Sequence, residues 1–168
     1  PGGIAQGAQI VSARIINDEP PDDDGTGQGN EISGPIGLAS IHRDMMDRGV
    51  KILNNSWGGL YWTNLDATAP IAAEFRPFVV DHGGLVVFAT GNGAFDDPSE
   101  TAMLPSVEGH GGSTPGADLE VGWLAVTALD RDDTSLLAEY ANACGAAMDY
   151  CLAAPGSVVA TGTDDAPD

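Results

Sequence analysis

Residues 83–92 read G-G-L-V-V-F-A-T-G-N, an apolar run that follows two glycines and ends in a polar, glycine-rich turn. Both alternating sets of side chains in L-V-V-F-A are apolar, which is typical of a strand that is covered on both faces. Residues 123–129, W-L-A-V-T-A-L, repeat this pattern. Strands of this kind predict a parallel sheet that lies between helices.

Helical segments separate the expected strands. Apolar residues at helical spacing predict one helix that Ser33 caps and Gly49 ends. A second helix is expected over residues 68–82, with a disturbance at Pro77. Further strands are expected at residues 9–16, 50–54 and 157–160. Because strands and helices alternate, we predict an α/β fold with three layers, in which a parallel sheet lies between helices.

The composition indicates a folded, acidic protein. Among 168 residues, 25 are Asp or Glu and six are Lys or Arg, so the formal charge is −19. This charge argues against nucleic acid or an anionic membrane surface as a partner. Hydrophobic residues form 42% of the chain, which suffices for a core. No apolar run approaches the about 18 residues that a membrane-spanning helix needs, so no transmembrane segment is expected.

Two of the expected strands end in turns that are suited to chemistry, because ligands of parallel sheets bind at the carboxyl ends of strands. Asn92 lies in one of these turns, and its amide could stabilise a developing oxyanion. In the other turn, Gly58 and Gly59 leave main-chain groups accessible to an extended peptide. A plain turn without chemistry is the alternative in both places. A nucleotide site is disfavoured, because no phosphate-binding motif accompanies either turn.

Five segments in order resemble the subtilisin-like serine proteases, or subtilases. G-I-A-Q-G-A-Q-I-V-S-A-R-I at residues 3–15 is similar to the family's G-V-A-P-x-A-x-I, and V-K-I-L-N-N-S-W-G-G at 50–59 is similar to V-I-N-x-S-x-G. The run at 83–92 is similar to G-V-V-V-V-A-A-A-G-N. The last two segments are W-L-A-V-T-A-L-D at 123–130 and D-Y-C-L-A-A-P-G at 149–156.

This resemblance implies a subtilisin-like fold and gives the two turns specific roles. Asn92 would be the amide of the oxyanion hole. The S1 pocket, which receives the side chain before the scissile bond, would have two walls. They would be formed by Ser56, Trp57 and Gly58 on one side and by Ala89, Thr90 and Gly91 on the other.

The family's three catalytic motifs, D-[ST]-G, H-G-[TS]-x-V-A and G-T-S-M-A-x-P, do not occur in these 168 residues. We therefore expect residues 1–168 to be the central part of one subtilase peptidase domain, truncated and inactive alone. The longer protein would be a secreted serine endopeptidase that acts on protein or peptide substrates. A catalytically silent subtilase-like domain, with a peptide-binding or structural role, is the alternative.

The resemblance also implies that one strand is missing. In the family, the strand that ends at the catalytic Asp lies between the strands that correspond to residues 9–15 and 50–54. Without it, two apolar edges would face a gap. We expect the two strands to close up, a second chain to associate through these edges, or the chain to be poorly ordered.

Cys144 and Cys151 are the only cysteines. Their spacing alone leaves a disulfide and two free thiols open, and without a nearby His or further Cys it is poor for zinc. Residues 140–156, Y-A-N-A-C-G-A-A-M-D-Y-C-L-A-A-P-G, resemble a segment of subtilases carried as passenger domains by Gram-negative autotransporters. This resemblance implies a Cys144–Cys151 disulfide and a secreted or cell-surface location.

Acidic runs at residues 22–24 and 96–97 leave calcium binding open. Calcium takes about six to eight oxygen ligands, and neither run has the spacing of an EF-hand loop. Acidic loops are usually solvated, so we expect no metal or other cofactor.

Overall fold

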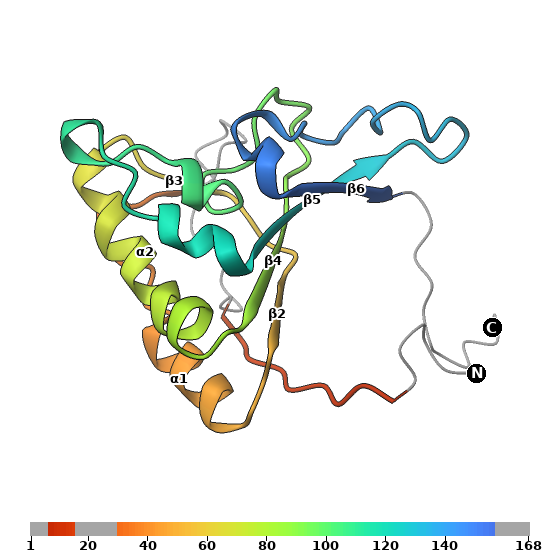
Figure 1. The fold of residues 1–168 in the computed structure, drawn as a ribbon. Coiled ribbons are helices and arrows are strands. Elements are labelled where there is room, and N and C mark those ends of the chain that lie inside the picture. Colours follow the sequence, from red (N-terminus) through yellow and green to blue (C-terminus); the bar gives the residue numbers. More distant parts are fainter. Residues whose placement is uncertain (1–6, 16–29, 157–168) are drawn as a thin grey trace.

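The computed structural model describes residues 7–15 and 30–156. A parallel four-stranded sheet, in the order β2-β4-β5-β6, organises this part of the chain (Figure 1). Its strands are β2 (Ile52–Asn55), β4 (Leu85–Ala89), β5 (Trp123–Leu129) and β6 (Cys151–Pro155). A separate parallel pair joins β1 (Asn30–Glu31) to β3 (Leu60–Tyr61). The predicted α/β class and the bounds of β4 and β5 are therefore confirmed.

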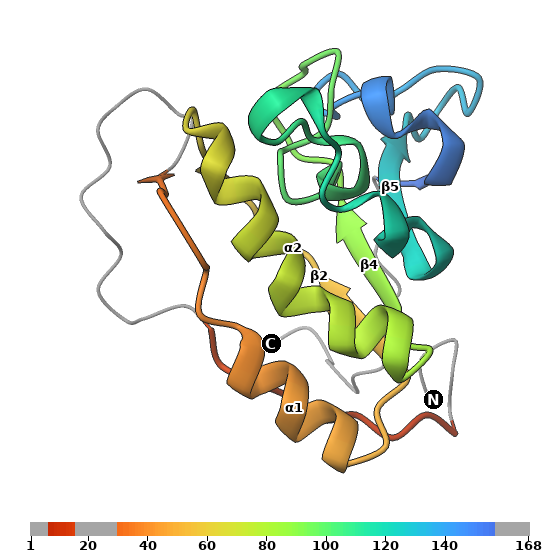
Figure 2. The same ribbon diagram turned by 60° about the vertical axis from the view of Figure 1, so that its left-hand side comes forward.

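Both α-helices of the described residues lie on the same side of the sheet (Figures 1 and 2). They are α1 (Ala39–Asp47) and α2 (Thr68–Arg76). Val86 and Phe88 of β4 point toward this side and are fully buried, whereas Val87, which points the other way, is only half-buried. The described residues thus form the sheet and one of the two helical layers that the sequence predicts.

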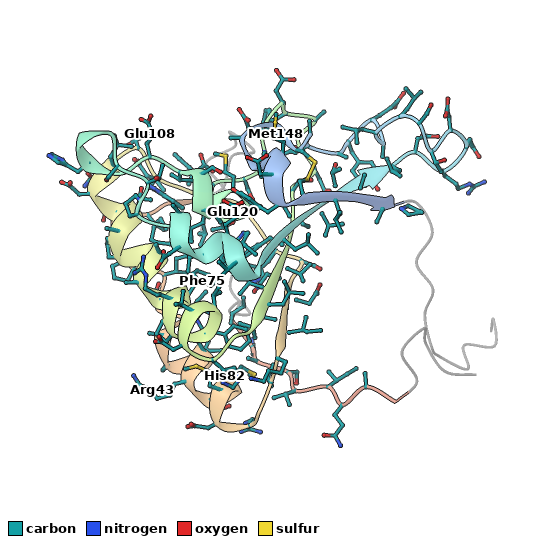
Figure 3. The ribbon with its side chains drawn as sticks, viewed as in Figure 1. Arg43, Phe75, His82, Glu108, Glu120 and Met148 are labelled. Carbon is teal, nitrogen blue, oxygen red and sulfur yellow. A yellow bond between two sulfur atoms is a disulfide. The ribbon has the colours of Figure 1, made fainter. Side chains whose placement is uncertain are left out.

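An aromatic cluster packs α2 onto the sheet. The ring of Phe75 lies 5.1 Å from that of Trp123 and 6.1 Å from that of Phe88, and the Phe88 and Trp123 rings stack at 5.4 Å. Figure 3 shows Phe75 between α2 and the strands. The indole N–H of Trp123 donates to the carbonyl of Ala102 at 3.0 Å, so the cluster has no unpaired indole donor.

Pro77 changes the second helix without ending it. The α-helix gives way there to a π-helical turn over Pro77–Asp81, closed by a 3.0 Å bond from the His82 N–H to the Pro77 carbonyl. Proline lacks the N–H that an α-helix would use at this position, which accounts for the change. The main chain at Gly84 passes close to the Phe78 ring. A Cβ at this position would lie 2.2 Å from that ring, so a larger residue does not fit.

The start of α1 differs from the sequence prediction. The helix begins at Ala39, not near Ser33, and no side chain at its N-cap position accepts a hydrogen bond. Instead Glu74 of α2, only 7% exposed, accepts from the N–H groups of Ile36 at 2.6 Å, Gly37 at 2.8 Å and Ala39 at 3.3 Å. A carboxylate from another helix therefore replaces the local cap.

Glu74→Gln should lower the free energy of unfolding by about 1–3 kcal/mol, because the amide keeps one acceptor oxygen and turns an N–H₂ group toward backbone donors. Urea denaturation measures the change. The exposed Glu120→Gln variant, with the same loss of charge, should stay within about 0.5 kcal/mol of wild type. Equal midpoints for the two variants would contradict the capping role of Glu74.

His42 lies in the same contact, where its Nδ1 is 2.8 Å from the main-chain oxygen of Glu74. Burial lowers the pKa of His42 below its ordinary value of 6.5, although the hydrogen bond and the charge of Glu74 oppose this shift. The unfolded chain then binds a proton more readily than the folded chain. The contribution of neutral His42 to the free energy of unfolding is therefore fully present above pH 6.5. It is lost as the pH falls toward the lower pKa that His42 has in the folded chain.

Accordingly, the free energy of unfolding of the wild type should fall between about pH 7 and pH 5. The fall should be shallower in His42→Gln, which keeps a polar side chain that does not titrate here. Chemical denaturation at several pH values measures both slopes. Parallel slopes would show that His42 does not cause the acid sensitivity.

Residues 9–15, predicted as a strand, belong to no strand in the structure. They are exposed, with Ile10 91% accessible, and no strand of residues 30–156 pairs with them. Together with β2 they line a cavity of about 710 Å³, so the two segments have not closed up. Buried Asn55 also lines this cavity, and its Nδ2 has no hydrogen-bond partner among the described residues. The strand predicted at 157–160 lies outside the described residues.

Candidate functional site

The carboxyl ends of β2 and β4 lie side by side, because Asn55 pairs with Phe88 in the parallel ladder. The turns that follow these strands therefore meet, as the sequence predicts. Together they line a cavity of about 590 Å³, a volume typical of ligand pockets. Six of the seven predicted site residues line it: Ser56, Trp57, Gly58, Ala89, Gly91 and Asn92.

Thr90 is the predicted site residue that does not line the cavity. Its side chain is fully buried, and its hydroxyl donates to the main-chain oxygen of Asn142 at 3.0 Å. Thr127 donates to the same oxygen at 2.6 Å. Thr90 therefore fixes the turn from inside the protein.

Asn92 presents its amide at the open side of this turn. The side chain is exposed, and no hydrogen bond to it is formed within residues 7–15 and 30–156. Gly91 before it has a φ of +121°, and a Cβ there would lie 2.7 Å from the amide nitrogen of Asn142. Glycine is therefore required where the main chain at residue 91 passes the Asn142 side chain. The resulting turn leaves the Asn92 amide available to a ligand.

Asn142, which is not among the residues predicted from the sequence, holds the turn in place. Its Oδ1 accepts from the N–H groups of Gly93 at 2.8 Å and Phe95 at 3.2 Å, and its Nδ2 donates to the Thr90 carbonyl at 3.2 Å. The residue is only 4% exposed. It lies 49 residues after Gly93, so spacing gives no signal. Its place in A-N-A-C-G, within the segment that carries the autotransporter resemblance, was the available clue.

Trp57 forms much of the opposite wall. Its indole N–H donates to Oδ1 of Asn55 at 3.0 Å, and its ring meets that of Phe88 edge to face at 5.3 Å. Next to it, Gly58 faces Ser99, whose hydroxyl would lie 3.8 Å from a Cβ on that glycine. A rigid aromatic surface and a glycine thus border the cavity on this side.

The disulfide Cys144–Cys151 is present, with the two Cα atoms 5.8 Å apart, and appears as a yellow bond in Figure 3. The disulfide implied by the resemblance is thereby confirmed. It closes a short loop that contains the 3₁₀ turn Gly145–Tyr150. Within this loop the N–H of Ala146 donates to Oδ1 of Asp97, a cavity residue, at 2.8 Å. The disulfide therefore braces one border of the cavity.

Reduction of this disulfide should lower the free energy of unfolding by about 2–3 kcal/mol, the loss of chain entropy expected for so short a loop. Guanidinium unfolding with and without reductant measures the change. The double variant with serine at positions 144 and 151 should match the reduced protein and should not respond to reductant. Alkylation of both thiols in the untreated protein would contradict the disulfide.

No group of three or more His, Cys, Asp or Glu side chains that could hold a metal ion occurs within residues 7–15 and 30–156. Of the two acidic runs, 96–97 belongs to this part and 22–24 lies outside it. In the same ranges, none of the helices is long and apolar enough to cross a membrane.

Comparisons with solved structures give the fold class. The chain is similar to the prenylagaramide maturation protease PagA, with a TM-score of 0.50 and 22% identity over 71% of this chain and 36% of that one. It is also similar to the PatG macrocyclase in complex with peptide, with a TM-score of 0.52 and 18% identity over 80% and 34%. Identities this low show a shared fold only.

The sequence supplies the family. Residues 2–167 match the subtilase family, and the chain therefore belongs to it. It is also similar to serotype-specific antigen 1 of Mannheimia haemolytica, with 34% identity over 74 residues, which are 44% of this chain and 7% of the antigen. The chain thus spans only a minor part of these relatives.

Proposed function

We propose that residues 1–168 are the central part of one subtilase peptidase domain in a serine endopeptidase that cleaves proteins or peptides. In this proposal the segment supplies Asn92 as the oxyanion-hole amide and the two walls of the S1 pocket. Thr90 supports its wall from behind. The observation that carries the proposal is the cavity at the ends of β2 and β4, which gathers six of the seven predicted residues.

The chemistry assigns distinct steps to this segment and to the rest of the enzyme. A serine attacks the scissile carbonyl, a histidine accepts its proton, and the carbonyl oxygen becomes an oxyanion. The exposed Asn92 amide is suited to donate to that oxyanion. Serine, histidine and aspartate must come from other segments, because their family motifs do not occur in this sequence. The 168-residue chain is therefore inactive alone.

A fluorophosphonate probe tests this proposal on the full-length gene product. The complete protein should be labelled, whereas the 168-residue chain should not. The full-length sequence should contain D-[ST]-G and H-G-[TS] before Pro1 and G-T-S-M-A after Asp168. A full-length protein without these motifs and without labelling would reject the protease proposal.

That outcome would favour the second candidate, a catalytically silent subtilase-like domain with a peptide-binding or structural role. The same cavity supports it, since a peptide could lie along residues 56–59 without being cleaved. Saturable peptide binding by an unlabelled full-length protein would establish this alternative.

We also propose that the protein is exported from a Gram-negative bacterium as an autotransporter passenger and acts in the medium or at the cell surface. The Cys144–Cys151 disulfide supports an oxidising compartment, and the similarity to an antigen of Mannheimia haemolytica agrees with surface exposure. Cell fractionation tests this location. Recovery of the protein only from the cytosol, with both thiols reduced, would reject it.

Within the described residues β2 is the edge strand of the sheet, and this edge supports a proposal of self-association. Its residues line the cavity shared with residues 9–15, where exposed Ile10 and Ile52 favour a further strand. The charge of −19 opposes contact between two copies, so association should strengthen with salt. Sedimentation velocity at low and high salt measures this. A monomer under both conditions at high protein concentration would reject the proposal.

A further inference from the structure

Residues 97–100 form a loop that lines the candidate S1 cavity. This loop carries a half-buried carboxylate, that of Glu100. The loop is fixed against the strand end, because the N–H of Ser99 donates to the Thr90 carbonyl at 2.8 Å. Ser99 in turn faces Gly58 across the cavity. Glu100 is therefore held on a braced segment beside the predicted pocket walls.

The surroundings of Glu100 disfavour a lone negative charge. Burial raises the pKa of its carboxyl group, and only a hydrogen bond to its own main chain opposes the shift. No ion pair to Glu100 is formed within residues 7–15 and 30–156. A partly desolvated carboxylate without a cation is stabilised when a ligand brings one.

The described lining of the cavity carries charge of one sign only. Asp97 adds a second carboxylate, whereas no Lys, Arg or His is found among the lining residues. Asp97 accepts a hydrogen bond from the Ala146 N–H of another loop, whereas the hydrogen bond to the Glu100 carboxyl group comes from its own main chain. The lining also includes Trp57 and Met103, against which the methylene groups of a long cationic side chain can pack.

We propose that this cavity selects peptides with Lys or Arg before the scissile bond, and that Glu100 is the residue that determines this specificity. The inference rests on the proposed function, since it takes the cavity as the S1 pocket. It names the substrate class that this pocket favours: basic residues, with neutral apolar residues second and acidic residues last.

Peptide binding to the 168-residue chain tests the inference without cleavage. The probes are fluorescein-labelled Ala-Ala-Ala-Xaa amides in which Xaa is Lys, norleucine or Glu, and anisotropy gives each dissociation constant. Norleucine has nearly the length of Lys and no charge. Wild type should bind the Lys peptide about tenfold more tightly than the norleucine peptide, as expected for a charge-assisted contact.

Glu100→Gln should remove most of this preference while leaving norleucine binding unchanged. Glu120→Gln is the matched control, because it removes the same charge from an exposed residue that does not line the cavity. It should keep the full preference. Circular dichroism of both variants confirms that they fold like wild type.

The outcomes distinguish a wrong specificity from a wrong assignment of the peptide cleft. If wild type binds norleucine as tightly as Lys, or if Glu100→Gln keeps the preference, the specificity is wrong and the peptide cleft stands. If none of the three peptides binds to wild type, the cleft itself is wrong, and the proposed function fails with it.

Discussion

Asn142→Ala is expected to lower the free energy of unfolding by about 2–3 kcal/mol, because two backbone N–H groups lose their acceptor and a carbonyl loses one of its two hydrogen bonds, at about 1 kcal/mol each. The N–H groups are those of Gly93 and Phe95, and the carbonyl is that of Thr90, which keeps its bond from the Ser99 N–H. Asn142 is itself only 4% exposed, so alanine also removes buried side-chain contacts. Urea unfolding, followed by tryptophan fluorescence, measures the loss.

Two further variants make this prediction specific. Asn64→Ala removes an exposed asparagine that accepts one hydrogen bond from the Asp66 N–H, and it should cost about 1 kcal/mol or less. Asn142→Asp keeps the acceptor for Gly93 and Phe95 but turns a carboxylate oxygen toward the Thr90 carbonyl. It should therefore be destabilised at neutral pH. If Asn142→Ala costs no more than Asn64→Ala, Asn142 does not hold the turn.

The elements predicted correctly are those whose signal is local. Leu85–Ala89 and Trp123–Leu129 begin and end as expected, because continuous apolar runs between glycine or polar turns define buried strands. The meeting of the two site turns was implied by the family resemblance, and the sheet explains it, since adjacent parallel strands bring their carboxyl ends to one edge. Family resemblance alone added the disulfide between Cys144 and Cys151.

The features missed depend on contacts between distant residues. The start of α1 is set by Glu74, which lies 35 residues beyond Ala39, so no local capping pattern reveals it. Residues 9–15 have the composition of a strand but form none, because a strand also requires a partner. Asn142 belongs to the site through hydrogen bonds to a turn some 50 residues earlier.

If the full-length protein is the proposed protease, Asn92→Ala should lower its kcat by about 100- to 1,000-fold, the loss measured when one oxyanion donor is removed elsewhere. KM should change little, because the amide meets the oxyanion of the transition state more strongly than the carbonyl of the substrate. Steady-state kinetics with a peptide ending in a Lys anilide measure both constants. Titration of active sites with a fluorophosphonate corrects for inactive enzyme.

Asn92 and Asn142 should then differ in a way that separates catalysis from folding. Asn92 is exposed and makes no hydrogen bond to another described residue, so its removal should leave the free energy of unfolding within about 0.5 kcal/mol of wild type. Asn142→Ala should instead lower stability and activity together, since it releases the turn that carries Asn92. Asn64→Ala should leave kcat unchanged. An unchanged kcat in Asn92→Ala would assign the oxyanion to another donor, whereas a rise in KM alone would make Asn92 a substrate-binding residue.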